Sequence, residues 1–203
     1  WVWLLKNLAP VAELEVRGLK TRYRQPGIGA PLSATPALAP GDASADDFVS
    51  PDTKVPLTLF LRLERPRQQL AGGNLAGSFE VFIPQTSASG AENTVSIGTR
   101  LVPLEIETTA TLAYALSESS IWEQEITHFF DNLGVDGKQG ASLTMAGPYR
   151  PGRIPVVLVH GTGSSSGRWA ELLNRLVNDP RIRQRYQFWF FSYATGNPIG
   201  YSA

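Results

Sequence analysis

The chain has 203 residues, of which 42% are hydrophobic and 18% are charged. This composition is typical of soluble globular proteins and argues against disorder throughout. Eighteen basic residues balance eighteen acidic ones, so no strong overall field favours nucleic acid or an anionic membrane as a partner. The absence of cysteine excludes disulfides, thiol catalysis and cysteine-ligated zinc. The two histidines, His128 and His160, lack metal-ligand spacing, and we therefore expect neither a metal nor another cofactor.

Residues 1–50 are predicted to form an irregular arm with one short strand at residues 13–16. The stretch from Gln25 to Gly41 is dense in proline, glycine, alanine and serine, which favour turns and extended backbone. The apolar opening at residues 1–5 is too short for a signal-peptide core or a membrane span. Because the chain lacks an initial methionine, we expect a fragment, and membrane association through an upstream anchor stays open.

Residues 51–150 are predicted to be rich in half-buried antiparallel strands. Apolar and polar residues alternate in short runs broken by turn residues: 57–61, 79–83, 95–97 and 102–106. A helix is expected over 120–131, because Ser120 and Glu123 fit a capping box at its start. A glycine-rich linker follows, and a domain boundary is expected near Arg150.

Residues 151–203 are predicted to form a β-α-β unit, which places this part of the chain in the α/β class. The continuous apolar run 155–159 favours a strand buried on both faces of a parallel sheet. A second such run covers 187–193. Between them, apolar residues recur with helical spacing up to Asp179: Trp169, Leu172, Leu173, Leu176 and Val177. We expect a right-handed crossover between the two parallel strands.

The segment His160-Gly161-Thr162-Gly163 directly follows the first of these strands. A right-handed unit puts this loop at the carboxyl end of the strand, which is where open α/β sheets bind ligands. Glycine allows the backbone to approach a substrate closely, and free amides there can face a developing negative charge. The loop is therefore a candidate oxyanion hole.

Residues 154–163 resemble the strand and His-Gly oxyanion loop of α/β-hydrolases, especially bacterial lipases and esterases. The resemblance extends through the helix and the strand that follow, about a quarter of the chain. It implies the first β-α-β unit of an α/β-hydrolase parallel sheet and hydrolysis of small-molecule or lipid esters through an acyl-enzyme. Residues 1–150 resemble the strand-rich leader of bacterial envelope hydrolases, which implies a location in the cell envelope.

The resemblance also implies roles for individual residues. The backbone amide of Thr162 would donate to the oxyanion, while His160, Gly161 and Gly163 would shape the loop. The family's nucleophile, acid and base come later in chain order, so they would lie outside this chain, and the fragment itself would be inactive. Ile199 and Tyr201 either border the acyl pocket or pack against the next helix.

Two other catalytic interpretations of this loop are weaker. Ser165 sits within a formal G-x-S-x-G pattern that begins at Gly163. A nucleophile elbow joins strand to helix directly, whereas here the three residues 160–162 lie between the strand and the pattern. Helix capping is the better interpretation of Ser165. His160 is better interpreted as a residue that organises the loop than as a proton-transferring base.

Two alternative functions also remain. Gly161, Gly163 and Gly167 approach a dinucleotide-binding pattern, although the next strand ends without the acid that would hold a ribose. Arg168 stands where a P-loop carries lysine. The second alternative is a noncatalytic binding protein that retains the hydrolase fold.

Two charged groups outside the loop are interpreted as surface. Glu105 and Glu107 could imitate a carboxylate pair, but acids at i and i+2 of a strand are usually a solvated face. The arginines at 181, 183 and 185 are predicted to form a solvated connection between helix and strand.

Overall fold

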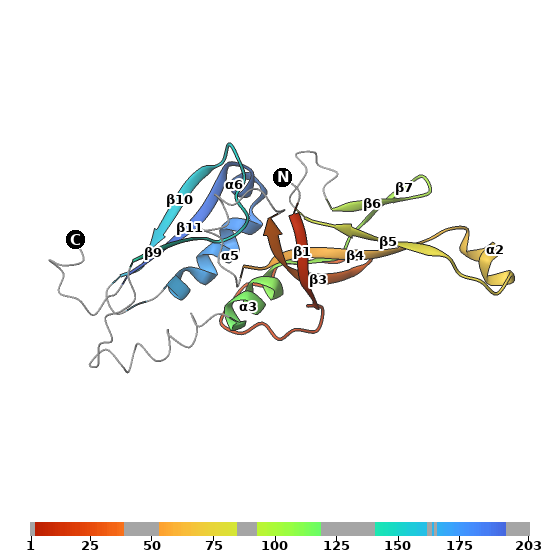
Figure 1. The fold of residues 1–203 in the computed structure, drawn as a ribbon, viewed down its shortest axis with the longest axis horizontal. Coiled ribbons are helices and arrows are strands. Elements are labelled where there is room, and N and C mark those ends of the chain that lie inside the picture. The colour runs from red at the N-terminus through yellow and green to blue at the C-terminus, as the bar shows by residue number, and fades with distance from the viewer. Residues whose placement is uncertain are drawn as a thin grey trace.

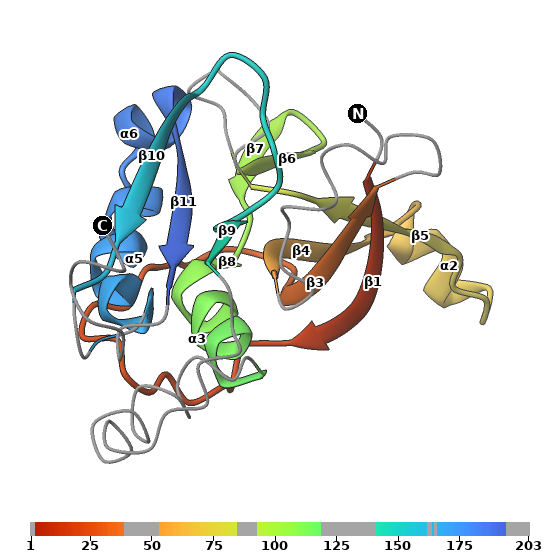
Figure 2. The ribbon, with the colours of Figure 1, turned by 60° about the vertical axis from the view of Figure 1, so that its left-hand side comes forward.

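The computed structural model describes residues 3–38, 53–84, 93–118, 141–161, 164 and 166–193. Its strands are β1 (Trp3–Pro10), β2 (Arg24–Gln25), β3 (Ala30–Leu38), β4 (Val55–Leu63), β5 (Gly77–Phe82), β6 (Thr94–Ile97), β7 (Arg100–Pro103), β8 (Ile106–Glu107), β9 (Ser142–Met145), β10 (Ile154–Val159) and β11 (Tyr186–Ser192). Its helices are α2 (Pro66–Ala71), α3 (Thr108–Glu118), the 3-10 helix η1 (Ser166–Trp169), α5 (Ala170–Asn178) and α6 (Pro180–Arg185). Figures 1 and 2 show two main sheets, with α3 between them.

The larger sheet has four antiparallel strands in the order β1-β3-β4-β5. β3 is a central strand, although its sequence was expected to belong to an irregular arm. Leu32 and Ala34 alternate along it and pack with Leu57 of β4 in a buried cluster, so burial outweighs the low strand propensity of this proline-containing segment. The strand predicted at residues 13–16 does not form, and β1 lies earlier in the chain.

Glu107 is buried at the junction of β8 and α3, which corrects its interpretation as part of a solvated face. Only 1% of the residue is exposed. One carboxylate oxygen accepts a 3.0 Å hydrogen bond from Nε of Arg22, and the other accepts from the backbone amide of Ala110, also at 3.0 Å. The second bond satisfies an amide in the first turn of α3, a helix that the sequence analysis missed. The helix expected over 120–131 lies outside the described residues.

The second sheet has the order β10-β11-β9. β10 and β11 are parallel, as predicted, with Ile154 opposite Tyr186 and Val159 opposite Phe191. The predicted amphipathic helix corresponds to η1 and α5, and Leu173 of α5 packs in one cluster with Leu158 and Phe188. β9 pairs with β11 in the antiparallel direction, in a segment that was expected to be a linker.

The predicted fold class, an α/β protein carrying the first β-α-β unit of an α/β-hydrolase parallel sheet, is wrong. Of the described residues, 44% are in strands and 24% in helices, and the sheets are mostly antiparallel. Among the described strands, β10 and β11 are the only parallel pair. Periodicity in residues 154–193 identified two strands and a helix, but it carried no information on the direction of β9 or on the larger sheet. The predicted burial of the first strand on both faces is wrong, because Ile154, Val157 and Val159 of β10 are each about half exposed. No helix in the described part of the chain is long and apolar enough to cross a membrane.

Candidate functional site

His160 and Tyr193 lie together at the carboxyl ends of β10 and β11. His160 follows Val159, the last residue of β10, and Tyr193 follows Ser192, the last residue of β11. Because the two strands are parallel and adjacent, their carboxyl ends meet at one edge of the sheet. His160 is only 5% exposed, so a buried imidazole lies at this edge of the sheet.

Three contacts join His160 to Tyr193. The rings stack with centroids 4.8 Å apart and planes 11° from parallel. The Tyr193 hydroxyl donates to the carbonyl oxygen of His160 at 3.0 Å, and the Tyr193 amide donates to Nε2 at 3.4 Å. With Nε2 as acceptor, the ring proton lies on Nδ1, which is 3.2 Å from the carbonyl oxygen of Gly161. Each ring nitrogen therefore has a hydrogen-bond partner, Nε2 at the end of β11 and Nδ1 in the loop itself.

Gly161, the residue that follows His160, faces open space among the described residues. Gly161 is exposed, and a Cβ at this position would meet no heavy atom within 4 Å. A substrate can therefore approach the backbone here without displacing a side chain. Ser164, three residues on, has a buried hydroxyl that makes no hydrogen bond with the part of the chain that the structure describes.

The structure describes only some of the predicted site residues. Thr162, Gly163, Ser165, Ile199 and Tyr201 lie outside the described residues. The structure thus places His160 and Gly161 together at the sheet edge. Within the described ranges no group of three or more histidine, cysteine, aspartate or glutamate side chains could hold a metal ion.

Sequence reasoning missed Tyr193 as the partner of His160. The signal was present, because a strand ending near residue 193 and a parallel strand ending at residue 159 must place Tyr193 beside His160.

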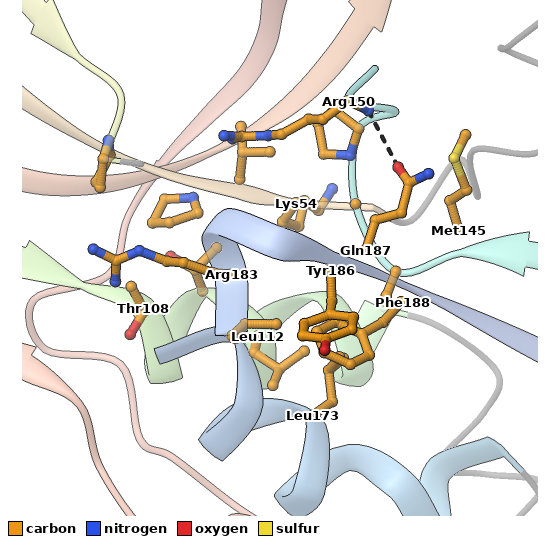
Figure 3. Close-up of a pocket in the computed structure, with 18 of the residues that line it drawn as sticks. Lys54, Thr108, Leu112, Met145, Arg150, Leu173, Arg183, Tyr186, Gln187 and Phe188 are labelled. Atoms are coloured by element: carbon orange, nitrogen blue, oxygen red, sulfur yellow. Dashed lines mark hydrogen bonds between the residues drawn. The ribbon is translucent and has the colours of Figure 1, made fainter. Parts of the chain in front are cut away.

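Sequence reasoning also missed a pocket at the opposite end of this sheet (Figure 3), which Arg150, Arg153 and Arg183 help to line. Arg150 was interpreted as a domain boundary and Arg183 as part of a solvated connection.

Comparison of the chain with protein-family models, with curated proteins and with solved structures found no match.

Proposed function

We propose that this chain carries the oxyanion-stabilising loop of a serine hydrolase that cleaves small-molecule or lipid esters. The observation that supports this proposal is the fixed position of His160, whose ring and carbonyl oxygen are both held by Tyr193. In this proposal, the support of His160 orients the backbone amide of Thr162, which would donate to the substrate. An amide that is oriented before the reaction needs no reorganisation when negative charge develops on a substrate oxygen, and such preorganisation is a large source of catalysis.

In the proposed reaction, a serine oxygen attacks the ester carbonyl carbon and its proton passes to a histidine. The carbonyl oxygen becomes negatively charged, and the backbone amide of Thr162 donates to it. The carbon–oxygen bond to the alcohol then breaks, the alcohol takes the proton from the histidine, and water releases the acid from the acyl-enzyme in a second cycle. His160 supports the loop in this scheme, since both of its ring nitrogens are engaged. In this proposal the nucleophile, acid and base lie outside these 203 residues.

Labelling with a fluorophosphonate probe tests the proposal. We expect a protein extended by the downstream reading frame to be labelled and to hydrolyse a short-chain p-nitrophenyl ester, while the 203-residue chain is neither labelled nor active. In the extended protein, Tyr193→Phe should lower kcat by about tenfold with little change in KM, because it loosens a loop that acts in the transition state.

Two results would contradict the proposal. An extended protein that is folded but neither labelled nor active would instead favour a noncatalytic binding protein. Labelling of the 203-residue chain that is lost in Ser165→Ala would move the nucleophile into the loop itself.

A further inference from the structure

A pocket of about 140 Å³ lies between the two main sheets (Figure 3). The first three residues of β11, Tyr186, Gln187 and Phe188, line it. His160 follows the last residue of the parallel strand β10, so the pocket and the His160 loop lie at opposite ends of the same sheet. Any ligand of this pocket is therefore separate from the proposed ester site.

One side of the pocket is apolar. Leu112 of α3, Leu173 of α5 and Phe188 of β11 group together on this side in Figure 3. Leu173 and Phe188 belong to the buried cluster that joins α5 to the sheet, so this wall is part of the packed core. The cavity volume is close to the roughly 150 Å³ in which a benzene molecule is known to bind inside a protein.

The pocket is also lined by cations, namely Lys54, Arg150, Arg153 and Arg183. None of the described lining residues is acidic. Burial, followed by the charges of Arg153 and Arg183, lowers the pKa of Arg150 to about 10. Burial and the charge of Arg183 likewise lower the pKa of Arg153. Burial of these guanidinium groups and their mutual repulsion therefore both disfavour their charged forms.

Arg153 has the clearest capacity for a ligand. It is half-buried, and its side chain makes no hydrogen bond or ion pair with any residue that the structure describes. A guanidinium group presents a planar fork of donors that matches a carboxylate in two parallel hydrogen bonds. A carboxylate at this position would also offset the repulsion among the arginines.

We propose that this pocket binds a small organic carboxylate whose apolar group is about the size of a benzene ring. The carboxylate would lie against Arg153 and its neighbouring cations, and the apolar group would contact Leu112 and Phe188. Charge alone would accept any anion and the apolar wall alone would accept any small hydrophobic molecule, whereas the combination selects a ligand that has both parts.

Calorimetric titration of the 203-residue chain with benzoate tests the proposal. We expect one saturable site with a dissociation constant of about 1 mM or lower. Acetate has the charge without the ring, and benzyl alcohol has the ring without the charge, so each should bind at least about tenfold more weakly. Added salt should weaken benzoate binding, because the attraction is partly electrostatic.

Substitution of Arg153 locates the site. Arg153→Gln should weaken benzoate binding by about tenfold or more, and Arg153→Lys should give an intermediate affinity because it keeps the charge but loses the fork. Arg185→Gln is the matched control: Arg185 is exposed and does not line the pocket, so its loss should change the affinity less than about twofold. Thermal unfolding checks that each variant is folded.

Four results would overturn the proposal. These are no saturable binding of benzoate, equal binding of acetate, equal binding of benzyl alcohol, and an Arg153→Gln affinity equal to that of the unsubstituted chain. None of these results bears on the fluorophosphonate experiment, so the two proposals can fail separately.

Discussion

Thr109 of α3 and Asn174 of α5 are joined by a 3.0 Å hydrogen bond from Oγ1 of Thr109 to Oδ1 of Asn174, and neither residue is exposed to solvent. Asn174 also donates through Nδ2 to the carbonyl oxygen of Thr21 at 2.7 Å. The hydroxyl of Thr109 in turn accepts from the amide of Tyr23 at 2.8 Å. A buried polar network therefore ties the helix that covers the β10-β11-β9 sheet to a segment from the N-terminal part of the chain.

We expect Asn174→Leu to lower the free energy of unfolding by about 2–3 kcal/mol. The substitution removes the side-chain amide that bonds both the carbonyl oxygen of Thr21 and the hydroxyl of Thr109. Within the described residues it leaves that carbonyl oxygen and the hydroxyl proton only the long 3.5 Å hydrogen bond between them, and a poorly satisfied buried polar group is costly. Urea denaturation measures the change. Asn74→Ala, at an exposed position, should cost less than about 0.5 kcal/mol, and an equal loss in the two variants would show that the network contributes no stability.

Tyr193→Phe tests the support of His160 in the isolated chain. The substitution removes the 3.0 Å hydrogen bond to the carbonyl oxygen of His160 but keeps the ring stack. It should cost about 1 kcal/mol of unfolding free energy and speed amide hydrogen exchange at Gly161. Tyr186→Phe, which removes a hydroxyl that makes no hydrogen bond with the described residues, should change neither quantity. Unchanged exchange at Gly161 in Tyr193→Phe would contradict the support of the loop by Tyr193.

Glu171 makes the stability of the chain depend on pH in the acid range. Its pKa is lowered to about 2, chiefly by the hydrogen bond from Arg175 and then by those from Lys20 and Thr21. Because the pKa in the folded state lies below the usual 4.5, the carboxylate stabilises the fold fully above pH 4.5, and this contribution is lost as the pH falls towards 2.

The difference in unfolding free energy between the unsubstituted chain and Glu171→Gln should therefore shrink between pH 5 and pH 2. Urea denaturation at several pH values measures it. Glu64→Gln is the control, because Glu64 is exposed and its side chain makes no hydrogen bond with the described residues; its difference should stay near zero. A Glu171→Gln difference that is constant with pH would show that the ion pair is absent in solution.

The outer edge of β10 should promote self-association. Within the described residues β10 pairs only with β11, and Ile154, Val157 and Val159 are each about half exposed. An apolar strand with unpaired backbone groups is a template for pairing with another chain. Sedimentation velocity should show association that rises with concentration, and Val157→Lys should weaken it by about tenfold or more. Leu101→Lys on β7 should have little effect, and monodisperse monomers at all concentrations would contradict this prediction.

Prediction from sequence was most successful where the signal was local. The helix preceding Asp179 has an apolar stripe at helical spacing, and the strands at 154–159 and 186–192 are long apolar runs, so each was found within a residue or two. The burial of Glu107 was not predictable, because its ion-pair partner Arg22 lies 85 residues away in the sequence. The pocket was missed for the same reason, since its cations come from three separate parts of the chain.

The sequence by itself determined the elements around the candidate site: two apolar runs that pair in parallel, a covering helix and a His-Gly loop between them. These depend on side-chain periodicity and on short-range backbone preferences, which a single chain displays directly. Only the tertiary structure decided the antiparallel pairing of β9 with β11, the central place of β3, the stacking of Tyr193 on His160 and the cation-lined pocket. Each of these depends on contacts between residues far apart in sequence, whose burial free energy exists only after the chain has folded.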